Sequence, residues 1–395
     1  MTPPRPAAQS RRGPRQRPRP AARHLDLAAV VADPTVRIVV CCGSGGVGKT
    51  TTAASLALLA AEQGRRTVVL TIDPARRLAQ SMGLTELDNV PRPVAGVDTA
   101  KGGSLDAMML DMKRTFDEVV ESHSTPDKAG QILANPFYQA VSSSFAGTQE
   151  YMAMEKLGQL RAEDRWDLIV VDTPPSRSAL DFLDAPERLG SFLDGRLIRI
   201  LTAPARAGGK AYLRLVTAGF SLVTNTLTKI LGGELLRDVQ TFVAALETMF
   251  GGFRERADRT YALLQRPETA FVVVASPEGD ALREASYFVE RLGEDRMPLA
   301  GLVLNRVHGG GVQGLTAESA LAGAERLDAT RGHGLTSALL RLHAERLQVV
   351  AREERLYERF RAAHPHVAVA RVKAFATDVH DLDGLREVSA ELGRG

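Results

Sequence analysis

The sequence predicts an α/β protein built on a doubly wound, mostly parallel sheet that carries a phosphate-binding loop and an inserted helical subdomain. First, short runs of β-branched residues alternate with segments of helix length over most of the 395 residues. Second, these runs are almost continuously apolar, as expected for strands that helices cover on both faces. Third, a glycine-rich segment at residues 43–50 follows the first run directly.

Seven runs have the length and composition of buried strands. In chain order they are Val36–Cys42, Thr67–Ile72, Leu105–Leu110, Leu168–Asp172, Phe271–Ala275, Gly301–Asn305 and Val367–Val372. Most of the segments between them are long enough for the crossover helices that parallel strands require. No internal repeat is present, so the chain contains one copy of this architecture.

Two stretches, residues 113–160 and 185–265, contain no convincing strand and are predicted to be mainly helical. The second is unusually apolar, and a helical subdomain inserted between sheet strands accounts for both. A further helix is expected at Ser337–His364, which Pro365 would end. Its apolar face is predicted to contain Leu339, Leu342, Leu347 and Val350.

Residues 1–24 differ in composition from the rest of the chain, with seven arginines, six prolines and no acidic residue. Such a segment buries too little apolar surface to fold, so we predict a disordered arm followed by one folded domain at residues 25–395. The arm is either a solvated extension or a contact for anionic partners such as nucleic acid or lipid headgroups.

Charge and hydropathy disfavour nucleic-acid binding by the folded domain, a membrane span and secretion. Outside the arm, acidic residues outnumber basic ones by four, so we expect no specific nucleic-acid binding by the folded domain. No run approaches the roughly 18–20 apolar residues of a membrane span. No apolar stretch follows the charges of the arm, as one would in a signal peptide. These features predict a cytoplasmic protein.

The glycine-rich segment fits the phosphate-loop pattern G-x-x-x-x-G-K-[ST], with a strand before it and a helix after it. Its glycines allow successive backbone N–H groups to surround phosphate oxygens at the positive end of the helix. In such loops the lysine contacts the β- and γ-phosphates of a nucleotide, and the following hydroxyl ligates Mg²⁺. The predicted nucleotide-binding residues are Gly43, Ser44, Gly45, Gly46, Val47, Gly48, Lys49, Thr50 and Thr51.

Two aspartates follow buried strands, Asp73 after the second predicted strand and Asp172 at the end of the fourth. In an open α/β sheet, ligands bind beyond the carboxyl ends of the strands, so both carboxylates should converge on the phosphate loop. Either aspartate alone is equally consistent with a turn residue. Together with the loop they indicate a site in which Thr50 and Asp172 hold Mg²⁺ and Lys49 and Asp73 act in catalysis.

Several motifs together resemble the ArsA/GET-type ATPases, a family of dimeric phosphate-loop proteins with arsenite-efflux and tail-anchored-protein-targeting members. These motifs are GSGGVGKTTTA, TIDPARRL, VVDTPPS, GLVLNRV and DVHDLDGL, and the resemblance extends over residues 30–390. It implies that residues 25–395 are an ATPase domain of a bacterial, single-copy type, which binds ATP and Mg²⁺. By this resemblance, Asp73 would position the attacking water, Asp172 would lie on the magnesium side, and Asn305 would hydrogen-bond the adenine edge.

The chain departs from the family pattern at Ser44, where the family has a second lysine that reaches the phosphates of the partner subunit. A symmetric dimer of this chain would lack that cation at both sites. Either Arg76 or Arg177 replaces it, or a lysine-bearing paralogue supplies it in a heterodimer. Metal-linked pairing of subunits is not expected, because the zinc-binding cysteine pair of the eukaryotic members is missing.

Three functions remain open at this point. The favoured one is an ATP-hydrolysing dimeric switch, which couples nucleotide state to a helical subdomain that binds a client protein or a membrane partner. The alternative is a weakly hydrolysing regulatory subunit of a heterodimer. A partition-type ATPase that positions DNA or membranes is less favoured, because the folded domain is acidic. Neither a zinc site nor an arsenite site is expected, because Cys41 and Cys42 point to opposite faces of one strand.

Overall fold

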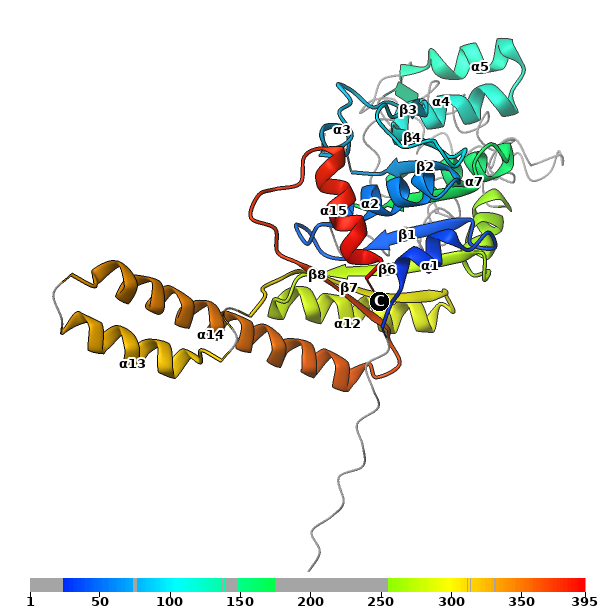
Figure 1. Cartoon of the computed structure of the whole chain (residues 1–395). Coiled ribbons are helices and arrows are strands. Elements are labelled where there is room, and N and C mark those ends of the chain that lie inside the picture. The colour runs from blue at the N-terminus through cyan, green and yellow to red at the C-terminus, as the bar shows by residue number, and fades with distance from the viewer. Residues whose placement is uncertain are drawn as a thin grey trace, which may run out of the picture.

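The computed structural model describes residues 24–73, 77–136, 138–139, 148–174, 255–310, 312, 314–329 and 332–394. Its centre is an eight-stranded sheet in the order β3-β4-β2-β5-β1-β6-β7-β8 (Figure 1). All neighbouring strands are parallel except β3 and β4. The predicted α/β class with a mostly parallel sheet is therefore confirmed.

All seven predicted strands are present, with ends that differ by a few residues. The strands are β1 (Ile38–Cys42), β2 (Arg66–Thr71), β3 (Arg92–Pro93), β4 (Ser104–Met109), β5 (Leu168–Asp172), β6 (Thr269–Ala275), β7 (Leu299–Val307) and β8 (Val369–Lys373). The additional strand, β3, consists of two exposed residues at the sheet edge. It was not predicted because two polar or proline residues carry no hydrophobic pattern.

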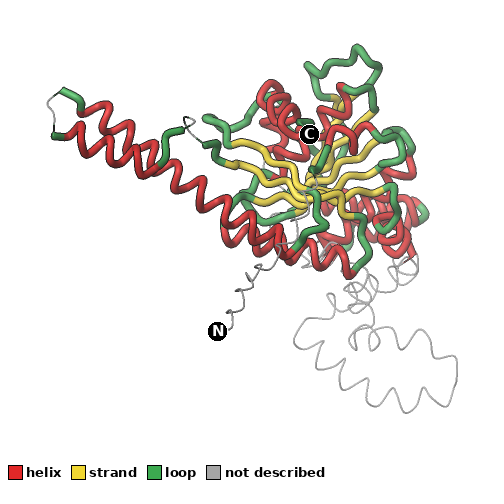
Figure 2. Tube along the Cα trace, turned by 60° about the horizontal axis from the view of Figure 1, so that its bottom comes forward, coloured by secondary structure: helices red, strands yellow, loops and turns green. Residues whose placement is uncertain are grey.

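The chain builds one side of the sheet first and then the other. From β1 it moves outward to β2 and β4, returns with β5 beside β1, and continues on the opposite side through β6, β7 and β8. Because crossovers between parallel strands are right-handed, this reversal places helices on both faces of the sheet (Figure 2). It also produces a crevice at the carboxyl ends of the strands near β1.

The helices α1, α2 and α15 pack against one another on one face of the sheet. The helices α12 and α14, which flank β7 in the chain, contact each other. The bounds are α1 (Leu27–Ala32), α2 (Lys49–Glu62), α3 (Arg77–Ser81), α4 (Met112–His123), α5 (Pro126–Leu133), α7 (Thr148–Glu163), α12 (Gly279–Glu294), α13 (Ala317–Asp328), α14 (Gly334–Ala363) and α15 (Leu382–Leu392). No helix in the described part of the chain is long and apolar enough to cross a membrane.

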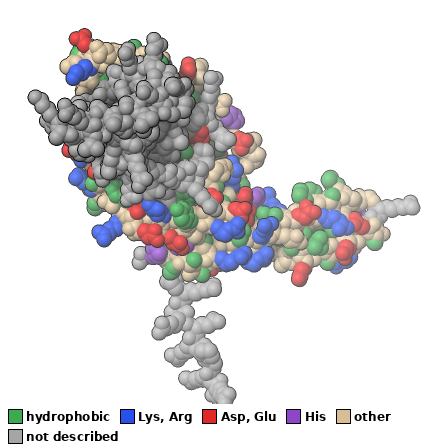
Figure 3. All heavy atoms as spheres, turned by 180° about the vertical axis from the view of Figure 1, so that it is seen from behind, with side chains coloured by type: hydrophobic (Ala, Val, Ile, Leu, Met, Phe, Trp, Pro, Cys, Tyr) green, Lys and Arg blue, Asp and Glu red, His purple; other side chains and the backbone are tan. Residues whose placement is uncertain are grey.

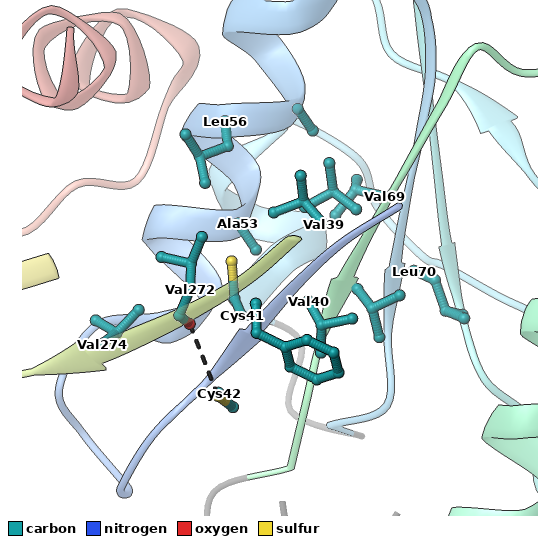
Figure 4. Close-up of a cluster of buried hydrophobic side chains, with 14 of the residues drawn as sticks. Val39, Val40, Cys41, Cys42, Ala53, Leu56, Val69, Leu70, Val272 and Val274 are labelled. Atoms are coloured by element: carbon teal, nitrogen blue, oxygen red, sulfur yellow. Dashed lines mark hydrogen bonds between the residues drawn. The ribbon is translucent and has the colours of Figure 1, made fainter. Parts of the chain in front are cut away.

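The central strand β1 is buried along its whole length and contains both cysteines. Cys41 points toward Ala53 of α2, whereas Cys42 points away from α2 and lies 3.8 Å from the carbonyl oxygen of Val272 (Figure 4). Burial raises the pKa of the Cys42 thiol to about 12 and raises that of Cys41 well above its usual value. Both cysteines are therefore neutral core residues on opposite faces of the strand.

The predicted helical stretch at 113–160 contains α4, α5 and α7. Of the second stretch, residues 185–254 lie outside the described residues, and residues 255–264 are helical. Arg256 in that helix donates to both carboxylate oxygens of the buried Glu155 on α7, at 3.0 and 2.9 Å, and so joins the two stretches. Residues 1–23 of the predicted arm also lie outside the described residues, while His24 already pairs with Val369 of β8.

The helices α13 and α14 form a hairpin that projects away from the sheet (Figures 1 and 2). The sequence analysis did not predict α13, which packs on α14 through small residues. The Oγ atom of Ser337 on α14 donates to the carbonyl oxygen of Ala324 at 3.2 Å, and Gly323 faces Leu340. Viewed from behind, the hairpin carries hydrophobic side chains among acidic and basic ones (Figure 3).

The predicted apolar face of α14 is only partly a core face. Leu339 and Leu342 are 55% and 61% exposed, and Leu335, one turn before Leu339, is 78% exposed. The helical spacing places these leucines on the side of α14 that faces away from α13. On the same face further along the helix, Tyr357 and Phe360 are buried against the body of the protein. The periodicity therefore identified a continuous apolar face, but the outer half of α14 extends beyond the elements that would cover it.

Arg65, directly before β2, is joined at the amino-terminal edge of the sheet to the stretch from the end of α1 to β1 and to the residue before β5. Its guanidinium donates to the carbonyl oxygens of Val31, Asp33, Val36 and Asp167 at distances of 2.6 to 3.1 Å. The side chain is 9% exposed, so these carbonyl groups have little access to water. Removal of the guanidinium would leave several buried acceptors without partners.

We expect Arg65→Met to lower the free energy of unfolding by about 3 kcal/mol or more, because each buried acceptor left unpaired costs roughly 1–3 kcal/mol. Arg66→Met is the matched control. Arg66 is 52% exposed and pairs with Asp167 at the surface, so its loss should cost about 1 kcal/mol or less. Urea unfolding measured by circular dichroism tests both variants, and equal losses would contradict the structural role of Arg65.

Candidate functional site

The phosphate loop connects the carboxyl end of β1 to the amino end of α2, and close packing against two other strands fixes its path. A Cβ atom at Gly43 would lie 2.1 Å from the carbonyl oxygen of Val274 in β6. A Cβ atom at Gly48 would lie 2.2 Å from Nδ2 of Asn305 in β7, and the φ angle of +95° at Gly48 also favours glycine. Both glycines are thus required by the tertiary packing of the loop.

A cleft of about 730 Å³ opens at this loop, at the carboxyl ends of the strands. Its volume lies within the range of small-molecule sites. The amino end of α2 opens into it, so backbone N–H groups and the helix dipole favour an anionic ligand there. The predicted residues that line the cleft are Gly46, Gly48, Lys49, Thr50, Thr51, Asp73 and Asn305.

The remaining predicted residues lie around this lining. Gly43, Val47 and Asp172 are buried directly behind it, Ser44 is partly buried, and Gly45 is exposed. The Oγ atom of Ser44 is itself buried and has no hydrogen-bond partner among the described residues. The two arginines considered as replacements for the missing lysine, Arg76 and Arg177, lie outside the described residues.

Lys49 is the first residue of α2 and is 5% exposed. Its Nζ atom donates to the carbonyl oxygen of Ser44 at 2.7 Å, which holds the ammonium group within the curve of the loop. Burial lowers the pKa of Lys49, and the nearby carboxylates of Asp172 and Asp73 partly oppose this effect. The loop thus carries a poorly solvated cation where phosphate oxygens would be bound.

Asp172, the last residue of β5, is fully buried between two threonine hydroxyls. Its Oδ2 atom accepts hydrogen bonds from Oγ1 of Thr50 at 2.8 Å and from Oγ1 of Thr71 at 3.0 Å. Burial raises the pKa of Asp172 to about 6, although both hydroxyls and Lys49 favour the ionised form. Its Oδ1 atom is buried without a hydrogen-bond partner in the described part of the chain.

This donor set fits a nucleotide-bound magnesium ion. Mg²⁺ prefers hard oxygen ligands and is usually held by one or two carboxylates together with phosphates and water. The Asp172 carboxylate and the Thr50 hydroxyl are adjacent oxygen donors, and Oδ1 of Asp172 remains available. Among the described residues, no group of three acidic, histidine or cysteine side chains could hold a metal by itself.

Asp73 follows β2 and lines the cleft. Its backbone N–H donates to Oγ1 of Thr71 at 3.2 Å, so Thr71 connects both predicted acidic residues. The negative charge of Asp73 raises the pKa values of Lys49 and Asp172, which places all three groups in one electrostatic cluster. Thr71 was not predicted as a site residue, although a threonine that ends the apolar run VVLT was a usable signal.

Asn305 links β7 to the phosphate loop. Its Nδ2 atom donates to the carbonyl oxygen of Val47 at 2.9 Å, and its Oδ1 atom accepts from the backbone N–H of Arg306 at 2.9 Å. Arg306 has a φ of +60°, uncommon for a residue with a side chain. The assignment of Asn305 to the adenine edge remains a prediction, and the structure adds a role in positioning the loop.

The cleft is also lined by residues that were not assigned to the site from the sequence. They are Gln80, Ser81, Arg306, His308, Ala374, Phe375, Thr377, Asp378, Val379, His380 and Val388. Most come from the end of β7 and from the segment between β8 and α15. The motif DVHDLDGL, which lies partly in that segment, was the available signal.

Three relatives illustrate the similarity to known proteins. The ATPase ASNA1 homolog 1 of Paramecium tetraurelia is 23% identical over 71% of this chain and 78% of its own length. The ATPase GET3C of Arabidopsis thaliana is 26% identical over 67% of this chain and 65% of its own length. The ATPase ARSA2 of Chlamydomonas reinhardtii is 28% identical over 71% of this chain and 73% of its own length.

A family model described as anion-transporting ATPase matches residues 36–314. The match includes the phosphate loop, both aspartates and Asn305, and it ends shortly before α13. It covers well over half of the chain, in agreement with the site geometry and with the resemblance found in the sequence motifs. The chain therefore belongs to the anion-transporting ATPase family.

Proposed function

We propose that this protein binds ATP with Mg²⁺ and hydrolyses it as a dimeric switch that acts on a client protein or a membrane partner. The observation that carries the proposal is the buried Asp172 carboxylate, hydrogen-bonded to Thr50 of the phosphate loop and to Thr71 beside Asp73. Three strand ends and one helix end thus bring together Lys49, the Thr50 hydroxyl and the Asp73 carboxylate at the cleft lining, with the Asp172 carboxylate buried behind it. The relatives are named as ATPases, which supports the same activity here.

Each group then has a separate role. The loop N–H groups and the amino end of α2 bind phosphate oxygens, and Lys49 supplies a positive charge to the β- and γ-phosphates. Thr50 and Asp172 would hold Mg²⁺, which neutralises charge on the phosphates. Asp73 would orient the attacking water and accept its proton. Because Asp73 follows β2 and Asp172 ends β5 beside the phosphate loop, these two positions are suited to report whether the γ-phosphate is present.

The helical parts of the chain are proposed to change conformation with the nucleotide that is bound. Asp172 precedes the apolar stretch 185–265 in the sequence, and the contact between the buried Glu155 and the partly buried Arg256 joins the end of that stretch to α7. The dimer, the cytoplasmic location and the client-binding role are inferred from the family resemblance and the composition. The absence of a basic surplus outside the arm continues to disfavour a DNA-positioning role.

A second candidate is a weakly hydrolysing subunit that depends on a lysine-bearing paralogue. Ser44 favours it, because a neutral, short side chain cannot deliver a charge across a dimer interface. A cation supplied in trans can accelerate phosphoryl transfer by roughly 10³–10⁵. The two candidates share the nucleotide site and differ only in where that cation originates.

Lys49→Met should weaken ATP binding by roughly 10- to 150-fold, because a charged hydrogen bond contributes about 1.5–3 kcal/mol. Isothermal titration calorimetry measures the affinity. Lys113→Met on α4, which removes a largely exposed lysine outside the cleft, is the control and should bind ATP like the wild type. Unchanged affinity in Lys49→Met would show that the loop does not bind phosphates.

Asp172→Asn should raise the stability of the nucleotide-free protein at pH 8 by up to about 3 kcal/mol while weakening Mg²⁺-dependent ATP binding. The pKa of about 6 lies above the ordinary carboxyl value of 3.8, so the folded state binds the proton more tightly than the unfolded state. Stability should therefore fall as pH rises from about 4 to 6, and the ionised carboxylate should remain unfavourable above that window. Asparagine can still accept both threonine hydrogen bonds without a buried charge.

Thermal unfolding of wild type and Asp172→Asn between pH 4 and pH 8 provides the test. The two proteins should have similar stability near pH 4, where the carboxyl is protonated, and should diverge as pH rises. If the asparagine variant were the less stable protein at every pH, Asp172 would be a structural residue rather than a ligand held ready for a cation.

Ser44→Lys should raise ATP hydrolysis by the pure protein at least tenfold, since it restores a charge that each subunit can offer to its partner. Ser44→Ala is the control and should leave the rate unchanged. Steady-state phosphate release measures both, with and without a lysine-bearing family paralogue. A fast wild-type enzyme that neither the lysine nor the paralogue stimulates would exclude the missing-cation hypothesis.

A further inference from the structure

We propose that His308 binds the nucleoside part of the nucleotide, with its Nε2 atom accepting a hydrogen bond from a ribose hydroxyl or a base amino group. In this arrangement Glu353 of α14 is the positioning residue that fixes the imidazole. The proposal rests on the proposed ATP site and assigns a residue to its nucleoside part. It also connects the cleft directly to the helix that forms the projecting hairpin.

Glu353 holds His308 by two hydrogen bonds. The backbone N–H of His308 donates to Oε2 of Glu353 at 3.0 Å, and Nδ1 of the ring lies 2.6 Å from Oε1. Glu353 is 8% exposed, so its carboxylate depends on these partners. Because a carboxylate only accepts hydrogen bonds, Nδ1 must carry a proton, and in the neutral form of the ring Nε2 is then the acceptor.

The position of His308 within the cleft indicates what Nε2 would meet. His308 lines the same cleft as the phosphate loop, follows Asn305 by three residues, and has a side chain that is 44% exposed. If the adenine edge lies at Asn305, as the family resemblance implies, a nucleotide with its phosphates at the amino end of α2 has its sugar and base on the side of the cleft that His308 lines. In the described structure the Nε2 atom makes no hydrogen bond to another residue.

The chemistry of Nε2 selects the nucleoside over the phosphates. Phosphate oxygens are acceptors, so a neutral Nε2 gains nothing from them, whereas ribose hydroxyls and the adenine amino group are donors. Arg306, on the same rim, can supply charge to anionic groups instead. In its neutral form the fixed ring therefore favours a hydrogen-bond donor of the nucleoside over a phosphate oxygen.

Through the same contact, nucleotide binding at His308 would act on α14. Glu353 lies where α14 leaves the body, and Arg346, two turns earlier, also contacts the segment after β7 through the carbonyl oxygen of Gly309 at 3.4 Å. The outer half of α14 with α13 forms the projecting hairpin (Figure 1). The family match ends at residue 314, so the helix that supplies Glu353 lies beyond the matched region.

The first test is His308→Phe, which keeps a planar ring but removes both nitrogens. It should lower ATP affinity about 3- to 10-fold, the effect of one neutral hydrogen bond, while Mg²⁺-tripolyphosphate binds as in the wild type. His123→Phe on α4 is the control for a histidine outside the cleft. Equal losses for ATP and tripolyphosphate, or no loss for either, would overturn the proposal.

The second test identifies the donor with ATP analogues in the wild type. A ribose contact predicts a 3- to 10-fold loss with 2′-deoxy-ATP or 3′-deoxy-ATP, and a base contact predicts that loss with purine riboside triphosphate, which lacks the amino group. His308→Phe should bind ATP and the affected analogue equally. If His308→Phe retained the wild-type preference among the analogues, His308 would not be the acceptor.

Glu353→Gln tests the positioning role, because an amide that accepts from the His308 backbone N–H must donate to Nδ1 and thereby move the ring proton to Nε2. If the contact is to the ribose, its hydroxyl can instead accept a hydrogen bond from the protonated Nε2, so Glu353→Gln should retain its ATP affinity. If the contact is to the base, the adenine amino group cannot accept, so the ATP affinity of Glu353→Gln should fall as in His308→Phe. A disagreement between this variant and the analogue series would exclude tautomer control by Glu353.

Hydrogen exchange provides a readout that does not depend on affinity. Saturating ATP should slow exchange in α14 around Glu353 in the wild type but not in His308→Phe, and slowing in both would exclude the coupling. Failure of the proposed function is a distinct result. In that case the wild type would bind neither ATP nor tripolyphosphate, and the nucleoside contact would be excluded with it.

Discussion

The Asp172 carboxylate, buried between the hydroxyls of Thr50 and Thr71, is the interaction on which the site depends. A buried charge is unfavourable unless polar partners surround it, and here the carboxylate and its two partners come from three different segments. The amino end of α2, the end of β2 and the end of β5 must therefore reach one point. The parallel sheet provides this convergence because the carboxyl ends of neighbouring strands lie along one edge.

The phosphate loop is held by close contacts on its other side as well. Gly43 approaches β6 and Gly48 approaches Asn305 of β7 so closely that no side chain fits at either position. Asn305 in turn donates to the carbonyl oxygen of Val47 within the loop. The loop is thus fixed between the two halves of the sheet, and its N–H groups need little reorganisation to bind phosphates.

The helix α14 combines two environments along one face. Its inner part is buried, where Tyr357 and Phe360 pack on the body and Glu353 holds the segment after β7. Its outer part carries Leu335, Leu339 and Leu342 on the same face, which is exposed there because it faces away from α13. A single continuous helix therefore runs from the segment beside the nucleotide cleft to the end of the projecting hairpin.

The sequence alone determined the features that depend on neighbouring residues. The strand, glycine-rich loop and helix around Lys49 are contiguous, and each of the seven predicted strands has its own apolar run. Asp73 and Asp172 were found because both follow such runs. Their shared location could be expected from the known geometry of parallel sheets.

Only the tertiary structure decided contacts between residues that are distant in the chain. Thr71 and Asp172, and likewise His308 and Glu353, are brought together by the sheet and by α14, and no local pattern marks either pair. The exposure of Leu339 and Leu342 has the same cause. Helical periodicity reports which face of an element is apolar, whereas another element, placed by the whole fold, determines whether that face is covered.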